Sequence, residues 1–180
     1  MQFATTLFSV LTAFAFISNS AYAADICTYG TRSCFQGGTY GCCANIPAGE
    51  CCSWSSSSLG WSVRFSNMPG GWFGTTYGTQ FCTTQTSGIG SSASSGCSSV
   101  YTGSTYSNWY SARWNLNGRR TSPEAATSSS ECRRPNVLGY TWSNRQYQIE
   151  VPEGQYDHIT KLLDDGDFDA LNRIATEVKA

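Results

Sequence analysis

The chemistry most available to this sequence is that of its nine cysteines. Eight of them lie between residues 27 and 97, and the ninth, Cys132, stands alone further along the chain. An even set in an exported chain predicts disulfides, because such a chain meets an oxidising compartment. Adjacent cysteines rarely bond to each other, and the sequence leaves the connectivity open. We predict four disulfides confined to Cys27, Cys34, Cys42, Cys43, Cys51, Cys52, Cys82 and Cys97.

The N-terminus predicts export. Residues 1–23 carry no charged side chain, contain a long apolar stretch and end in the small-residue pattern Ala21-Tyr22-Ala23. This arrangement is typical of a secretory signal peptide cleaved after Ala23. No second apolar run of that length follows, so we expect a secreted, extracellular protein without a membrane span.

Other chemistries find few residues to carry them. His158 is the only histidine, and no nucleophile motif or phosphate-binding loop is present. The cysteine spacing and the single histidine disfavour zinc. A glycosidase needs two carboxylates in one cleft, and the cysteine-rich region holds only Asp25 and Glu50. Glu50 with Glu150 or Glu153 stays open, but we predict no cofactor, no metal site and no enzyme.

Two pairs of matching words indicate the elements that position the cysteines. "YGTRSC" at residues 29–34 returns as "YGTQFC" at 77–82, and "WSVRF" at 61–65 returns as "YSARW" at 110–114. The same order at nearly the same offset predicts two copies of one unit, about residues 25–68 and 73–117. Cys34 and Cys82 are then equivalent, as are Ser62 and Ser111.

The sequence motif at the end of each copy predicts a half-buried strand. In the first copy Trp61, Val63 and Phe65 share one face, and Ser62 and Arg64 share the other. A unit of this size buries too little surface to be stable alone. We therefore expect the apolar faces of the two copies to pack on each other as a sandwich.

The first copy resembles the βγ-crystallin repeat. Phe35-Gln36-Gly37 and Ser62-Val63-Arg64 match that repeat, whereas the second copy lacks Phe-x-Gly. The resemblance implies a mainly β, disulfide-rich Greek-key sandwich. Secreted fungal proteins, including plant-infecting effectors and killer toxins, use crystallin-like folds, and this chain resembles one of those. At the family's calcium positions Ser57, Ser58 and Trp61 stand in place of ligands, so we expect no calcium.

A change of charge divides the mature chain. Residues 24–120 hold five arginines and two carboxylates, a net +3, whereas residues 121–180 hold six basic and ten acidic residues, a net −4. The dibasic pair Arg119-Arg120 stands at the boundary, as a site for a kexin-type protease or as two solvated arginines. We predict a signal peptide over 1–23, a two-repeat domain over 24–120 and an acidic extension over 121–180.

The acidic extension predicts a hairpin and two short helices. Tyr140 and Trp142 precede a Ser143-Asn144 turn, and the alternating segment 147–151 follows it. "YDHITKLLDDG" and "DFDALNRIATEV" then predict helices, with Gly166 ending the first and Asp167 capping the second. We expect an apolar stripe on the second helix, formed by Phe168, Leu171, Ile174 and Val178.

These features favour a non-enzymatic effector or toxin that acts outside the producing cell at a host or competitor surface. The alternative is a carbohydrate-binding or structural cell-wall protein, and a secreted hydrolase comes third. The abundant aromatic residues either fill a β core or form a binding surface. For the second case the candidate surface residues are Trp54, Trp72, Trp109, Arg64 and Arg113. We expect an extracellular protein or a cell-wall glycan as partner, and no nucleic acid.

Overall fold

The computed structural model describes residues 22–35, 37–100, 108–116 and 132–178. The predicted signal peptide, apart from its last two residues, lies outside the described residues. So do Gln36 of the crystallin-like motif and the dibasic pair Arg119-Arg120.

The two predicted copies each form four strands. The first unit comprises β1 (Ala23–Tyr29), β2 (Tyr40–Pro47), β3 (Cys51–Ser53) and β4 (Ser62–Ser66). The second unit comprises β5 (Trp72–Tyr77), β6 (Gln85–Ser91), β7 (Gly96–Ser99) and β8 (Ser111–Leu116). The words "WSVRF" and "YSARW" fall on β4 and β8, the last strand of each unit.

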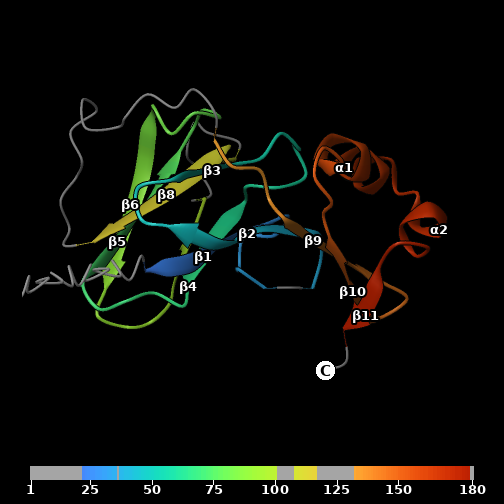
Figure 1. Cartoon of the computed structure of the whole chain (residues 1–180), viewed down its shortest axis with the longest axis horizontal. Coiled ribbons are helices and arrows are strands. Elements are labelled where there is room, and N and C mark those ends of the chain that lie inside the picture. The colour runs from blue at the N-terminus through green and yellow to red at the C-terminus, as the bar shows by residue number, and fades with distance from the viewer. Residues whose placement is uncertain (1–21, 36, 101–107, 117–131, 179–180) are drawn as a thin grey trace, which may run out of the picture.

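The strands form two sheets, and the third strand of each unit pairs within the sheet that contains the last strand of the other unit. One sheet has the order β11-β10-β9-β2-β1-β4-β7, and the other has the order β3-β8-β5-β6. β7 of the second unit therefore pairs with β4, and β3 of the first unit pairs with β8. This exchange is the Greek-key sandwich that the crystallin resemblance implies, and the predicted fold class is confirmed (Figure 1).

Alternation along the closing strands builds the core as expected. Val63 and Phe65 of β4 are fully buried, as are Ala112 and Trp114 of β8, whereas Arg64 between them is exposed. One glycine is required beside this core. Gly60 has φ +92, and a Cβ there would collide with the backbone carbonyl of Trp109.

The acidic extension continues the first sheet. β9 (Val137–Trp142) and β10 (Arg145–Glu150) form the predicted hairpin. Both turn residues, Ser143 and Asn144, have positive φ, which matches the right-handed twist of the strands. β9 pairs with β2, so the hairpin extends the sheet of the first unit.

The first predicted helix is confirmed and the second is shorter than predicted. α1 (Tyr156–Asp165) ends at Gly166 in the left-handed conformation. The side chain of Asp167 accepts a hydrogen bond from the backbone N–H of Ala170 at the start of α2 (Phe168–Leu171).

The chain after α2 turns and forms β11 (Thr176–Val178), which pairs with β10. Of the predicted apolar stripe, only Leu171 is buried, and Ile174 and Val178 are exposed. The prediction of this stripe was wrong. The unpaired edge of β10 provides backbone hydrogen bonds to residues 176–178, and these outweigh the helical pattern of the sequence. Within the described residues, no helix is both long enough and apolar enough to cross a membrane.

Candidate binding surface

The eight candidate cysteines form four disulfides, as predicted. None joins adjacent cysteines, and Cys132 stays outside all four. The pairs are Cys27–Cys42, Cys34–Cys97, Cys43–Cys52 and Cys51–Cys82.

Two of these disulfides repeat the symmetry of the fold. Cys34, which follows β1, bonds to Cys97 on β7, and Cys82, which follows β5, bonds to Cys51 on β3. Each bridge thus joins the first hairpin of one unit to the third strand of the other unit. Arg64 pairs with Cys97 in the strand register, and Arg113 pairs with Cys51 in the same way.

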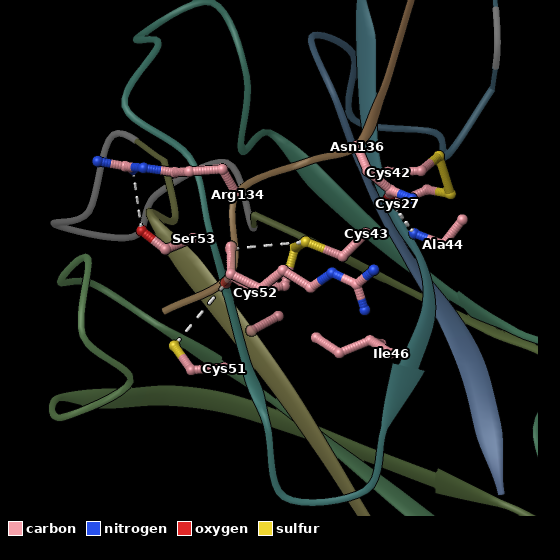
Figure 2. The surroundings of a disulfide bond; sticks show 12 residues. Cys27, Cys42, Cys43, Ala44, Ile46, Cys51, Cys52, Ser53, Arg134 and Asn136 are labelled. Carbon is pink, nitrogen blue, oxygen red and sulfur yellow. Dashed lines mark hydrogen bonds between the residues drawn. A yellow bond between two sulfur atoms is a disulfide. The ribbon is translucent and has the colours of Figure 1, made fainter. Parts of the chain in front are cut away.

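The other two disulfides belong to the first unit alone. Cys27–Cys42 joins directly paired residues of β1 and β2. Cys43–Cys52 joins β2 to β3, and therefore links one sheet to the other through the core. Figure 2 shows Cys43 and Cys52 with Arg134 nearby, whose guanidinium donates to the hydroxyl of Ser53 at 3.2 Å.

The three tryptophans named as candidates for a binding surface belong to the core, as in the first of the two interpretations. The exposed fractions of Trp54, Trp72 and Trp109 are 0%, 2% and 4%. The indole N–H of Trp54 donates to the carbonyl of Trp109 at 2.7 Å, and that of Trp72 donates to the carbonyl of Ala93 at 2.8 Å. Because all three rings are buried, these residues cannot form a binding surface.

Arg64 and Arg113 do not form one basic surface. Arg64 lies on β4 of the seven-stranded sheet, and Arg113 lies on β8 of the four-stranded sheet. Both alternate with core residues, so both point to the outer side of their own sheet. The outer sides of a sandwich face away from each other. The two arginines occupy equivalent positions in the two units. Because the equivalent strands β4 and β8 belong to different sheets, the two side chains lie on opposite sides of the sandwich.

A cluster of aromatic rings on the β9–β10 hairpin and on α2 is partly exposed. We define the hairpin aromatic surface as Tyr140 and Trp142 of β9, Tyr147 of β10 and Phe168 of α2. Ring centroids are 5.3 Å apart for Tyr140 and Tyr147, 5.5 Å for Tyr140 and Phe168, and 6.4 Å for Trp142 and Phe168. Trp142 exposes 38% of its surface, whereas Tyr140 beneath it exposes 1%.

Polar groups fix this cluster from below and from its rim. The hydroxyl of Tyr140 donates to Asn172 Oδ1 at 2.8 Å, and burial raises the pKa of Tyr140 to about 12, with a smaller contribution from Tyr147. At the rim the Arg145 guanidinium lies 3.2 Å from the Glu177 carboxylate. The hairpin aromatic surface therefore offers apolar rings beside both signs of charge.

A cavity of about 290 Å³ lies between the segment that precedes β9 and the segment that leads from β10 into the start of α1. Its walls include Arg134, Glu153, Tyr156 and Asp157. The Arg134 guanidinium lies 5.6 Å from the centre of the Tyr156 ring, and burial raises the pKa of Tyr156. Because the walls carry one positive and two negative groups, the charges of the cavity do not select one sign of ligand.

Two of the carboxylates considered for a hydrolase, Glu50 and Glu150, lie apart. Glu150 pairs with Val137, which pairs with Cys42 near the start of β2. Glu50 follows the opposite end of that strand, after Pro47. About five residue steps at about 3.3 Å span roughly 16 Å, whereas glycosidase carboxylates stand about 5–9.5 Å apart. The structure does not bring Glu50 and Glu150 together.

Part of the hairpin aromatic surface was present in the sequence but not recognised as a surface. Residues 140 and 142 share one face of a strand by alternation, and the short turn places residue 147 opposite Tyr140. That pattern alone predicts three rings on one side. The contribution of Phe168 depends on how α2 folds back over the hairpin, which no local pattern specifies.

The fold and the bridges define a class of protein: a disulfide-bonded Greek-key β-sandwich with a hairpin that extends one sheet. The family model ARB_05566_N, described as an N-terminal domain, matches residues 25–136, and the chain belongs to this family. The matched range contains both β units except the first two residues of β1, and it ends immediately before β9. No curated protein and no solved structure is significantly similar to the chain.

Proposed function

We propose that this protein is a secreted, non-enzymatic binding module of the effector or toxin type, and that the hairpin aromatic surface contacts its target outside the producing cell. Export is supported by the sequence of residues 1–23 and by the four disulfides, which form and persist in oxidising compartments. The crystallin-like resemblance supports the comparison with secreted fungal effectors and killer toxins.

The observation that carries the proposal is the exposed and supported ring of Trp142. Tryptophan is enriched among residues that dominate binding energy at interfaces, and such residues act best when their position is fixed. The Trp142 ring packs against the rings of Phe168 and Tyr147, with centroids 6.4 Å and 6.3 Å apart. Little side-chain freedom is left to lose when a target binds, because the ring is already held in place.

The experiment compares two exposed aromatic residues. Trp142→Ala removes the centre of the hairpin aromatic surface, and Phe81→Ala, at a side chain of the second unit that is 60% exposed, is the matched control. We expect Trp142→Ala to weaken the response of infiltrated leaf tissue, or the killing of competitor fungi, by about tenfold or more, as for an interface hot spot. Equal activity of the two variants would contradict this surface as the contact site.

A carbohydrate-binding role at a cell wall is the second candidate. It is favoured by the combination of partly exposed aromatic rings with Arg145 and Glu177, because binding sites combine apolar walls with a few placed polar groups. Pull-down of the oxidised protein on chitin, β-glucan and plant cell wall tests it. Retention that Trp142→Ala abolishes and Phe81→Ala preserves would favour this second function. Absence of retention together with a leaf response would favour the first.

A further inference from the structure

Cys132 is the third member of a sulfur cluster. The Sγ atoms of Cys51, Cys82 and Cys132 all lie within 4.8 Å of one another. Cys51 and Cys82 are buried and bonded to each other, and Cys132 packs against them and the Tyr77 ring with its thiol free. Because two of the three sulfurs share a disulfide, the cluster offers only one thiolate, and its chemistry is that of a thiol beside a disulfide.

This arrangement breaks the symmetry of the two units. The equivalent bridge, Cys34–Cys97, has no third sulfur at this distance, although all nine cysteines belong to the described part of the chain. The thiol therefore stands beside one particular bridge of the four. Cys132 reaches that position because the next residue, Arg133, is held by hydrogen bonds with the backbone of Cys51 and Ser53.

We propose that Cys132 exchanges with the Cys51–Cys82 disulfide, so that the protein interconverts between alternative bridges. The thiolate of Cys132 attacks one sulfur of the bridge, a new Cys132 disulfide forms, and the other cysteine leaves as a thiolate. The proton lost from Cys132 returns through solvent to the released cysteine. One disulfide and one thiol are present before and after, so the step requires no oxidant and no reductant.

The charged groups around the cluster affect how fast this step runs. Burial raises the pKa of Cys132, and the positive charges of Arg113 and Arg134 oppose that effect. The Nε atom of Arg113 is buried without a hydrogen-bond partner in the structure, and Arg113 is the residue paired with Cys51. Only the thiolate attacks. While the pH is below the thiol pKa, each increase of one pH unit therefore accelerates exchange about tenfold.

Each product fastens the chain differently. A Cys132–Cys82 bridge ties the chain just before β9 to the loop after β5, and it frees β3 of its bond to the second unit. A Cys132–Cys51 bridge ties that segment to β3 and frees the loop after β5. In both products the hairpin and helices gain a covalent link to the sandwich that is independent of residues 117–131.

Trypsin makes the exchange measurable, because the arginines separate the cysteines concerned. Cys132 falls in peptide 121–133, Cys51 in peptide 33–64 and Cys82 in peptide 65–113. The folded, full-length protein is incubated at about pH 6 and about pH 9, on either side of the ordinary thiol pKa of about 8.5. It is then quenched with acid, labelled with N-ethylmaleimide in denaturant and digested without reduction.

We expect free, labelled peptide 121–133 to be lost with time, faster at the higher pH, and to reappear disulfide-linked to the core peptides. Because Cys34–Cys97 keeps the two core peptides joined, the labelled digest is then reduced, and the label is found on peptide 33–64 if Cys51 was released, or on peptide 65–113 if Cys82 was released. Labelled 121–133 that stays constant at both pH values would overturn the proposal. So would a chain dimer bridged through Cys132 with Cys51–Cys82 intact.

Two variants separate exchange from general rearrangement. In Cys132→Ser the core peptides should gain no label, and gain at the wild-type rate would mean that Cys132 is not the nucleophile. In Cys51→Ser, folded under oxidising conditions, we expect a Cys82–Cys132 disulfide and no free thiol. If Cys82 and Cys132 both remain labelled while the other three bridges form, the sulfurs cannot reach each other and the proposal is wrong.

Discussion

The backbone N–H of Cys34 donates to the hydroxyl of Ser62 at 2.8 Å, and the hydroxyl donates in turn to the carbonyl of Thr31 at 2.7 Å. Ser111 does the same in the second unit, with Cys82 N at 3.0 Å and Thr79 O at 2.6 Å. The bridged cysteines have φ 50 and φ 52. One serine on the last strand of each unit thus holds the folded-over hairpin in the conformation that its disulfide requires.

Ser62→Ala and Ser111→Ala should each lower the free energy of unfolding by about 1–3 kcal/mol, because each leaves a buried backbone group without its partner. Denaturant unfolding of the oxidised protein measures the loss. Ser92→Ala, at an exposed serine, is the control and should stay within about 0.5 kcal/mol of the wild type. A loss confined to one of the two serines would contradict their structural equivalence.

The equivalence of these serines also marks how far the sequence predicts the fold. Local words repeated at an offset of 48 or 49 residues determine two units, their closing strands and the matching positions of Cys34 and Cys82. The pairing of β3 with β8 and of β7 with β4 leaves no such mark. It arises from packing between segments far apart in the chain, and the disulfide connectivity follows from it.

The binding residues were harder to predict because burial depends on that same packing. Trp54 and Trp142 are the same residue type, and each is followed directly by a serine. Trp54 is covered because β3 crosses to the second sheet, whereas Trp142 stands at the tip of a hairpin at the edge of the molecule. Neither fact is local. The cysteine count, by contrast, depends only on composition and compartment, and its prediction of four bridges was confirmed.

The assignment of Trp54 to the core has its own test. Trp54→Phe keeps an apolar ring but removes the N–H that the Trp109 carbonyl accepts. We expect it to cost about 1–3 kcal/mol for the unpaired carbonyl, in addition to the smaller ring volume. Trp142→Phe should change stability by less than about 1 kcal/mol, since that ring is partly exposed. Calorimetry or denaturant unfolding distinguishes the two, and equal losses would contradict the difference in burial.

Tyr140 predicts a loss of stability at alkaline pH. Its pKa is raised from the ordinary value of 10.0 to about 12 in the folded chain, first because burial disfavours the charged phenolate. The neutral form is therefore the stabilised one. Its contribution is complete below pH 10 and is lost as the pH rises towards 12. Tyr140→Phe should show a smaller decrease in unfolding free energy over this interval, and an unchanged decrease would contradict the assignment.

The pairing of β9 with β2 predicts what cleavage after Arg120 would do. Leu138, Tyr140 and Ile149 of the hairpin are 0–2% exposed, and the hydroxyls of Ser56 and Ser58 donate to Asp164 of α1 at 2.7 Å and 2.8 Å. The extension thus shares the core and is held to the sandwich by several independent contacts. Intact-mass measurement of protein from culture fluid first establishes whether the chain is cut at all, and a dominant species of residues 24–180 would end the processing hypothesis.

If the chain is cut, we expect residues 24–120 and 121–180 to elute together under native conditions. Separation would expose the core residues that pack against Leu138, and it would leave β2 as an unpaired edge strand of its sheet. In denaturant the two parts should separate, except in molecules where Cys132 has exchanged into a bridge. A protein expressed from residues 24–120 alone should lose several kcal/mol of unfolding free energy, since apolar surface contributes about 25 cal/mol per Å² buried. Full stability of that shorter protein would mean that the extension is a separate appendage rather than part of the sandwich.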